Sequence, residues 1–354
     1  MTAPLRATRV LVVDDSILSR LLLTRVLTAD RRIEVVGCAH SGAEAVAVLA
    51  HASPDVVTMD IHMPGQDGFA VTRQIMETRP VPIVVVSSDI AAGEMTNLFR
   101  AMEAGAVAVV EKPSGPGHPM HVALSRQLVE TVLAMAQVRV VRRWSRARGP
   151  RPEAEPPAVP APADAIRLIA IGASTGGPPA LLALLGALPR PCPVPVLVVQ
   201  HISAGFIEGL ARWLELSSGL RVKVAEHQER LVSGEVYLAP DDRQMELTPD
   251  WRLACEPGVA QGLCPSVAAL FRSLARVCGA TASAVLLTGM GRDGAAELKL
   301  MRERGAVTFA QDQASSVVFG MPGAAVEIGA ATHVAAPAEI GAMLSTLLMN
   351  RQRL

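Results

Sequence analysis

The feature that most restricts the fold of this chain is a regular alternation between short apolar runs and segments with helical spacing. In the first part of the sequence this alternation repeats five times. Short apolar runs are typical of buried strands, and parallel strands need a crossover, usually a helix, between them. The pattern therefore predicts a doubly wound α/β domain with a mainly parallel, flavodoxin-like sheet. Its expected strands are 9–15, 33–39, 55–60, 82–88 and 106–113.

The same alternation returns in the second half of the chain, from residue 166 onward. It predicts a second α/β domain that is Rossmann-like and also has a mainly parallel sheet. Helical segments separate most of the apolar runs. The expected strands are 167–172, 194–200, 221–226, 235–240, 283–289, 306–311 and 333–336.

Between the two patterns lies a stretch of different composition. Residues 142–163 are rich in Arg, Pro and Ala and show no apolar period. Such a stretch is typical of a linker that proline stiffens. The sequence therefore predicts a first domain at 1–141, a linker at 142–163 and a second domain at 164–354.

Charge and residue content argue against several classes of protein. The chain has 33 Lys and Arg against 33 Asp and Glu, and only 3% of its residues are aromatic. A nucleic-acid binder would depend on a basic excess or on aromatic stacking, so we expect no nucleic-acid partner. No uncharged apolar run reaches the ~18 residues of a membrane span, and the run before Asp14 is too short for a signal peptide. The five cysteines form no CxxC pair, and we expect a cytoplasmic protein with no membrane insertion.

Polar residues follow the expected strands of the first domain. Asp14 and Asp15 end the first run, Asp60 the third, Ser87 the fourth and Lys112 the fifth. The carboxyl ends of parallel strands meet at one edge of the sheet, where ligands bind. Clustered carboxylates favour a hard cation such as Mg²⁺, and one of them could accept a phosphoryl group. The metal and the lysine would then neutralise the charge on the phosphoryl oxygens.

The alternative is that these acids only cap helices. Asp15, just before the first helical segment, could do so. One acid alone would favour the cap, whereas all five polar positions together, at the ends of four strands of one sheet, favour a ligand site.

These motifs closely resemble the receiver domain of response regulators over residues 9–113. The matching stretches are VLVVDDS, VVTMDIHMPGQDG, VVVSS and AVVEKP. The resemblance implies that a histidine kinase phosphorylates Asp60, and that Ser87 is the switch hydroxyl beside Lys112. It also implies Mg²⁺ ligands, which would be Asp14, Asp15, Asp60 and the backbone carbonyl of His62.

A second set of polar residues begins in the stretch IAIGASTGGPPALLALL, residues 169–185. It reads as a strand, a glycine-rich turn and a helix, with Ser174 in a G-x-S-x-G pattern. This pattern places a serine hydroxyl on an exposed strand-to-helix turn, where it can act as a nucleophile. The alternative is a phosphate-binding loop at a helix N-terminus, although the P-loop lysine is missing.

A serine nucleophile needs a base, and three histidines lie in the second domain. His201 directly follows the most apolar strand, which places it on the same sheet edge as Ser174. His227 follows a more charged strand that we expect at the periphery, and His333 begins a strand at the opposite edge. His201 is therefore the predicted base.

The stretch 284–301 repeats the strand, glycine turn and helix, with Asp293 in the turn. Asp293 is the predicted residue that orients the base, although it could also cap the helix. Backbone amides near Met290 or Thr175 could form an oxyanion hole. The order Ser174, His201, Asp293 differs from that of the α/β-hydrolases, in which the acid precedes the histidine.

Together these motifs closely resemble the chemotaxis methylesterase family, CheB, over residues 166–335. The matching stretches are IGASTGGP, VLVVQHI, VYLAPDD, LLTGMGRDGA and TFAQDQASSVVFGMP. The resemblance implies that methyl-accepting chemoreceptors are substrates. The enzyme would hydrolyse glutamate methyl esters on their cytoplasmic helices and deamidate certain glutamines. It also gives Ser174, His201 and Asp293 the catalytic positions and Met290 that of an oxyanion donor, while the esterase chemistry needs no cofactor.

The chain departs from this family in two expected active-site loops. Residues 263–268 read LCPSVA where the family usually has His-Arg-Pro-Ser-Val-Asp, and residues 242–245 read DRQM where it often has Asp-x-His-Met. A non-enzymatic signalling adaptor with a degenerate esterase domain is therefore the alternative. For the enzyme, we expect that the unphosphorylated receiver covers the Ser174 face and that phosphorylation weakens this contact.

Overall fold

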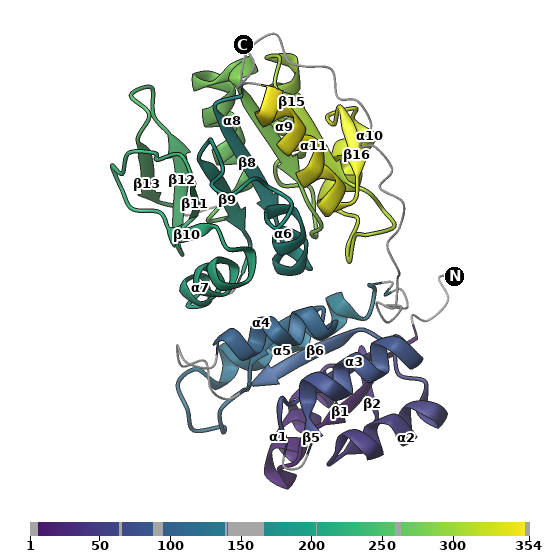
Figure 1. Ribbon diagram of the computed structural model, residues 1–354. Coiled ribbons are helices and arrows are strands. Elements are labelled where there is room, and N and C mark those ends of the chain that lie inside the picture. The colour runs from purple at the N-terminus through teal and green to yellow at the C-terminus, as the bar shows by residue number, and fades with distance from the viewer. Residues whose placement is uncertain are drawn as a thin grey trace, which may run out of the picture. The chain divides into compact units, whose positions relative to one another are not determined.

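A computed structural model of the protein divides the chain into two compact units, Met1–Gly149 and Pro150–Leu354. Figure 1 shows the elements of both units. The predicted linker at 142–163 lies outside the described residues, so its limits stay a prediction. The structure describes residues 6–63, 66–87, 95–138, 140, 166–202, 204–258 and 263–350.

The first unit is a doubly wound α/β fold, as predicted. Its described strands form a five-stranded sheet in the order β2-β1-β3-β6-β7, and every neighbouring pair is parallel. The strands are β1 (Thr8–Val13), β2 (Ile33–Ala39), β3 (Val56–Met59), β6 (Ile83–Ser87) and β7 (Ala108–Glu111). A small antiparallel pair follows β3, made of β4 (His62–Met63) and β5 (Gln66–Asp67). The strand order reverses at β1, and the predicted acidic residues lie next to this switch point.

Five helices within the described residues cover the two faces of this sheet. Helices α1 and α5 contact each other on one face, whereas α3 contacts both α2 and α4 on the other (Figure 1). The helices are α1 (Ile17–Thr28), α2 (Gly42–Ala52), α3 (Gly68–Thr78), α4 (Met95–Ala104) and α5 (His121–Met135). The N-cap of α1 is Ser16, whose hydroxyl accepts a hydrogen bond from Ser19 N–H. The capping role considered for Asp15 is thus filled by its neighbour.

The second unit contains a seven-stranded sheet among its described residues, in the order β10-β11-β9-β8-β14-β15-β16. All neighbouring pairs are parallel, which agrees with the predicted Rossmann-like class. The strands are β8 (Leu168–Ala173), β9 (Val196–Gln200), β10 (Arg221–Val224), β11 (Glu235–Leu238), β14 (Ala282–Leu286), β15 (Val307–Gln311) and β16 (His333–Ala335). Several strands are shorter than expected, since β9 begins at Val196, β11 ends at Leu238 and β14 ends at Leu286.

Helices cover both faces of this second sheet. Helix α6 contacts α7 and α11 in one layer of helices, and α9 contacts α8 and α10 in the other (Figure 1). The helices are α6 (Gly177–Leu185), α7 (Ile207–Ser218), α8 (Val267–Val277), α9 (Ala295–Glu303), α10 (Met321–Glu327) and α11 (Pro337–Asn350). Within the described residues, no helix is long and apolar enough to cross a membrane.

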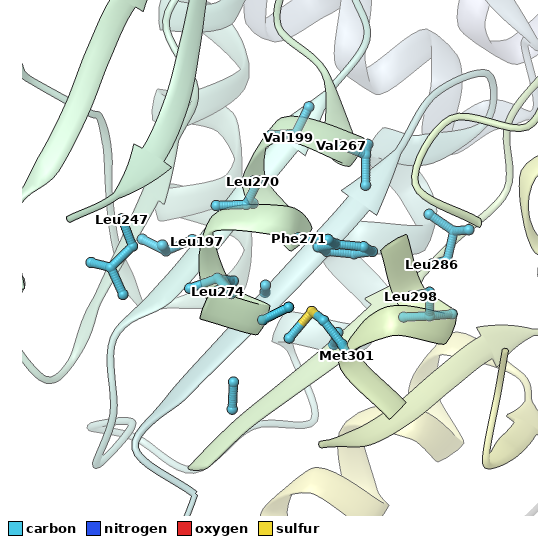
Figure 2. Close-up of a cluster of buried hydrophobic side chains, with 14 of the residues drawn as sticks. Leu197, Val199, Leu247, Val267, Leu270, Phe271, Leu274, Leu286, Leu298 and Met301 are labelled. Carbon is cyan, nitrogen blue, oxygen red and sulfur yellow. The ribbon is translucent and has the colours of Figure 1, made fainter. Parts of the chain in front are cut away.

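One element of the second unit was not predicted. Strands β12 (Arg243–Leu247) and β13 (Leu253–Pro257) form an antiparallel hairpin. Apolar residues at alternate positions, such as Met245 and Leu247, are buried in the core beside α8. Figure 2 shows Leu247 close to Leu197 of β9 and near Leu270 and Leu274 of α8. The hairpin therefore brings residues 242–245 close to the N-terminus of α8.

Candidate functional site

The acidic cluster of the first unit lies at the carboxyl ends of β1 and β3. Asp14 and Asp60 are both buried, and Asp15 lies nearer the solvent. Main-chain hydrogen bonds fix the positions of the buried pair, because Asp60 N–H donates to Val13 C=O at 2.9 Å. One carboxylate oxygen from each of the three residues lies within 4.8 Å of the others. This spacing suits a divalent cation with oxygen ligands.

Lys112 balances part of this negative charge. Its Nζ lies 2.7 Å from Asp14 Oδ2 and 2.7 Å from Asp60 Oδ2. Burial alone would lower the pKa of Lys112, but the two hydrogen bonds outweigh burial and raise it. Burial also raises the pKa of Asp14, despite its bond from Lys112. Two buried carboxylates and one ammonium leave net negative charge, so the residues present fit Mg²⁺.

The remaining predicted residues of this cluster also lie nearby. Ser87 ends β6, is 1% exposed, and its hydroxyl has no hydrogen-bond partner among the described residues. Its carbonyl accepts from Lys112 N–H at 2.7 Å. A buried unpaired hydroxyl is costly and fits a group that gains a partner in another state. His62 N–H donates to Asp60 Oδ1 at 3.1 Å, and the metal-ligand role of the His62 carbonyl stays a prediction.

In the second unit, Ser174 lies in the tight turn between β8 and α6. Its N–H donates to Thr288 C=O at 3.0 Å, and its C=O accepts from Gly177 N–H at 2.8 Å. Gly176 has a φ of +76°, a conformation that glycine adopts without strain. A Cβ on Gly172 would lie 2.3 Å from a side-chain atom of Val267. The glycines of the G-x-S-x-G pattern therefore allow both the turn and the close packing around it.

His201 lies beside Ser174 because the two residues follow a register pair. Ala173 of β8 pairs with Gln200 of β9, and His201 N–H donates to Ala173 C=O at 2.9 Å. Neighbouring strands are about 4.8 Å apart, so nucleophile and base leave the sheet side by side. The part of the chain that the structure describes has no hydrogen bond between Ser174 Oγ and His201. Such catalytic bonds are often long in a free enzyme.

Four hydrogen bonds hold the Asp293 carboxylate. His201 Nε2 lies 3.0 Å from Asp293 Oδ2, and Val267 N–H donates to the same oxygen at 2.7 Å. Ser266 Oγ and Ala268 N–H donate to Oδ1 at 3.0 and 3.1 Å. Burial raises the pKa of the Asp293 carboxyl, but the hydrogen bonds from His201 and the two N–H groups outweigh burial and lower it. Asp293 is therefore a firmly ionised carboxylate.

An ionised Asp293 determines which nitrogen of His201 can act as the base. A carboxylate only accepts hydrogen bonds, so Nε2 carries the proton that lies between the two side chains. In the neutral imidazole the other nitrogen, Nδ1, then has a free lone pair. No sequence pattern predicts this choice, which depends on contacts between the end of β9 and the turn before α9.

The predicted oxyanion donors belong to turns next to Ser174: Thr175 follows it in the chain, and Met290 follows Gly289, which packs on it. Neither Thr175 N–H nor Met290 N–H has a partner among the described residues. A Cβ on Gly289 would lie 2.5 Å from Ser174 Cβ, so the turn that carries Met290 packs directly on the serine. Two free N–H groups beside a hydroxyl suit the charge of a tetrahedral intermediate.

The other two histidines of the unit lie elsewhere. His227 accepts from Cys255 N–H at 3.2 Å, beyond the end of the edge strand β10. His333 begins β16, the opposite edge strand, and stacks on Phe309. Both positions agree with the prediction that His201 is the base.

The two loops in which the sequence departs from the CheB pattern contact each other. Gln244 Nε2 donates to Leu263 C=O at 2.6 Å, and Ser266 N–H donates to Gln244 Oε1 at 2.8 Å. The departure at Ala268 leaves its N–H in place, and this N–H binds Asp293. Ser266 and Gln244 were not predicted as supporting residues from the sequence. A serine just before a helix is a recognisable N-cap, and Ser266 does accept from Ala269 N–H.

Known proteins resemble both units of the chain. Two family models match the chain: the response regulator receiver domain over residues 10–123, and the CheB methylesterase over residues 169–344. A curated protein of Geobacter metallireducens, named protein-glutamate methylesterase/protein-glutamine glutaminase 4, is 50% identical over 97% of this chain and 99% of its own length. The chain belongs to the CheB methylesterase family.

Other CheB relatives and a solved CheB structure agree. A Nitrosospira multiformis protein named protein-glutamate methylesterase/protein-glutamine glutaminase is 47% identical over 97% of each chain. The crystal structure of the Thermotoga maritima CheB methylesterase catalytic domain matches with a TM-score of 0.50 and 34% identity. That match covers 52% of this chain and all of the solved domain. The receiver and CheB resemblances are thus confirmed, whereas the roles of individual residues stay predictions.

Proposed function

We propose that the protein is a protein-glutamate methylesterase that also deamidates certain glutamines, acts on methyl-accepting chemoreceptors in the cytoplasm, and is regulated by phosphorylation. Full-length similarity to curated proteins of that name supports the activity. The observation that carries the chemistry is the contact of His201 Nε2 with a firmly ionised Asp293, beside Ser174.

In the proposed reaction, Ser174 Oγ attacks the ester carbonyl carbon while His201 Nδ1 takes its proton. Thr175 and Met290 N–H groups stabilise the oxyanion. The tetrahedral intermediate collapses, the bond to the methoxy group breaks, and His201 returns its proton to release methanol. Water, deprotonated by His201, then attacks the glutamyl-serine ester and frees a glutamate and Ser174. With glutamine, ammonia leaves in place of methanol.

A methyl ester offers few groups for recognition, so the receptor helix has to supply most of the orientation. We therefore place the substrate specificity in contacts between the receptor and the surface around Ser174. Met290 lies at this surface with 37% of its area exposed, and Leu263 with 57%. Both could pack against an apolar strip of a receptor helix.

For the first unit, we propose that Asp60 accepts a phosphoryl group from a chemotaxis histidine kinase. Asp14, Asp15, Asp60 and the His62 carbonyl would hold Mg²⁺, which neutralises charge on the phosphoryl oxygens when it is bound. Lys112 would shift from Asp60 to the phosphoryl group, and the unpaired Ser87 hydroxyl would gain a partner there.

A surface beside the acidic cluster fits a protein phosphodonor. Ile17, Leu18 and Leu21 of α1 are 65%, 79% and 63% exposed. They follow Asp14 and Asp15 directly in the sequence, so a partner seated on them would reach the cluster. A charged residue in place of Leu18 is expected to slow phosphotransfer from the kinase but not from acetyl phosphate.

The proposed regulation is that the unphosphorylated receiver covers the Ser174 face. A fragment beginning near residue 164 tests this, since the second unit has its own core. The fragment should release methanol from methylated receptors without a phosphodonor, faster than the unphosphorylated full chain. A fragment no faster than that chain would show the receiver to be an activator or a targeting module instead.

The non-enzymatic adaptor is not favoured. It rested on the altered loops, yet residues of the 263–268 loop bind Asp293 through two N–H groups and a serine hydroxyl. A degenerate site would have no need to keep these contacts.

A further inference from the structure

Gln200 lies between the proposed nucleophile and the proposed base. It is the last residue of β9 and is 2% exposed. Its Nε2 donates to Ser174 C=O at 2.8 Å and to His201 C=O at 2.8 Å. A carboxamide nitrogen has two protons, and both are used here. One side chain therefore ties together the main chains of the two residues that have to exchange a proton.

We propose that Gln200 is a positioning residue that sets the distance between Ser174 Oγ and His201 Nδ1. The inference rests on the proposed function, because it assumes that these two atoms react. It adds to that function a residue that touches neither the substrate nor the reacting atoms.

The sheet alone does not fix this distance. Register pairing ends at Ala173 and Gln200, and the chain leaves the sheet at the next residue on both strands. Ser174 C=O is also held by Gly177 N–H, at 2.8 Å. For His201 C=O, Gln200 is the sole donor that the described residues provide. Without the Gln200 side-chain amide, His201 would keep the hydrogen bond from its N–H to β8, but its C=O would be free to rotate.

The hydrogen bond from Gln200 to His201 C=O is important because Nδ1 is the proposed base. Nδ1 is bonded to Cγ, so it lies closer to the main chain than Nε2 does. Asp293 holds the far side of the ring at Nε2. A shift of the His201 main chain would therefore turn the ring about that contact and move Nδ1 relative to Ser174. Misplacement by about 1 Å can slow a reaction about 100-fold.

The other end of the carboxamide argues against a purely structural role. Gln200 Oε1 is buried and has no hydrogen-bond partner among the described residues. It packs on Gly177, where a Cβ would lie 2.0 Å from this oxygen. A buried unpaired acceptor costs stability. An apolar residue of the same size would avoid this cost, so the bonds made by the amide nitrogen are what Gln200 offers beyond packing.

The test compares Gln200→Met with the wild-type full chain. Methionine fills a similar volume and has no donor. Two rates are measured: methanol release from methylated receptors, and the labelling of Ser174 by a small fluorophosphonate probe. Labelling forms a bond from Oγ to phosphorus and expels fluoride while the base takes the hydroxyl proton, so it depends on the base but not on receptor binding.

A matched control is Thr308→Val in β15. Thr308 is fully buried in the same sheet, two strands from β8, and its hydroxyl donates to Ala330 C=O at 2.7 Å. This change also replaces a buried polar group by an apolar one of similar size. It should lower stability without changing either rate per folded molecule.

For Gln200→Met we expect kcat and the labelling rate to fall by the same factor, about 10- to 100-fold, with KM within about twofold of wild type. Circular dichroism and the urea midpoint should show a folded protein. Labelling at the wild-type rate by a folded variant would overturn the proposal. If wild-type Ser174 does not label at all, the proposed nucleophile fails and this inference falls with it.

A second variant, Gln200→Glu, covers the case in which methionine disturbs folding. At about pH 8 a carboxylate would repel both carbonyls, and labelling should fall further. Burial raises the pKa of a carboxyl group, so a protonated carboxyl regains one donor at lower pH. The ratio of the variant rate to the wild-type rate should rise from about pH 8 to about pH 6. A constant ratio would contradict the role of the nitrogen-bound protons.

Discussion

The His201 imidazole contacts Asp293 through Nε2, at 3.0 Å, so the free lone pair of the neutral ring is on Nδ1. In the proposed mechanism this relationship makes Asp293 more than an orienting group. Asp293 would select the tautomer in which Nδ1 can accept a proton, and it would stabilise the imidazolium that forms during the reaction.

Asp293→Asn is expected to lower kcat by about 10²- to 10⁴-fold without unfolding the protein. An asparagine amide can donate to Nε2, which would move the imidazole proton to Nδ1 and block the base. Methanol release at saturating receptor measures the effect. The exposed Asp250→Asn, in the turn of the β12–β13 hairpin, is the control and should keep the wild-type rate. A similar loss in both variants would exclude this role of Asp293.

The lowered pKa of Asp293 also predicts how stability depends on pH. In the unfolded chain this carboxyl protonates near its ordinary pKa of about 3.9, whereas in the folded unit it stays ionised to lower pH. The stability it contributes is therefore complete above about pH 5 and is lost progressively as pH falls below the unfolded pKa and through the folded one. We expect Asp293→Asn to flatten the fall in the urea midpoint from about pH 5 to about pH 3.

Tryptophan fluorescence can follow this transition selectively. Trp213 and Trp251 lie in the described part of the second unit, and the remaining tryptophan, Trp144, belongs to the predicted linker. Trp213 is 2% exposed, so its emission should shift on unfolding. If the urea midpoint of the wild type fell with pH no more steeply than that of Asp293→Asn, the lowered pKa of Asp293 would be contradicted.

Gln244→Ala is expected to lower kcat about 3- to 10-fold, because the turn from Leu263 to Ser266 loses two hydrogen bonds of about 0.5–1.5 kcal/mol each. That turn carries the hydroxyl and N–H groups that hold Asp293. Arg276→Ala is the control, since it breaks an exposed ion pair between α8 and Glu246 of the same strand, β12, and leaves the turn untouched. Equal rates for Gln244→Ala and wild type would mean that the turn holds its shape unaided.

Asp60→Asn is expected to abolish phosphorylation by acetyl phosphate, because the amide is not a nucleophile for phosphoryl transfer. Lys112→Ala should still bind Mg²⁺, since the three carboxylates remain, but its methanol release should respond less to acetyl phosphate. The loss of phosphorylation in Asp60→Asn is measured as the loss of a phosphoryl label that both acid and base release. Wild-type labelling of the asparagine variant would refute the phosphoacceptor assignment.

The strand-end residues could be predicted from sequence because apolar runs have visible ends. Asp14, Asp60, Ser174 and His201 all follow such a run directly, and parallel strands bring their carboxyl ends together. The doubly wound class followed from the same alternation. These predictions needed only local patterns and one topological rule.

The supporting contacts could not be predicted in this way. Gln244 and Ser266 are 22 residues apart and meet only because an unpredicted hairpin packs on α8. The Gln200 bridge and the choice between Nδ1 and Nε2 depend on side-chain directions across neighbouring elements. Both are set by tertiary packing, which no local pattern encodes.

The most direct test of the account is methanol release from methylated chemoreceptor membranes by the phosphorylated full chain and by its Ser174→Ala variant. The wild type should release methanol, whereas the variant should remain folded and release none above the spontaneous rate. His201→Ala should be similarly inactive, because the catalytic residues act as a unit. Methanol release by the Ser174→Ala variant at the wild-type rate would contradict the central claim that this serine is the nucleophile.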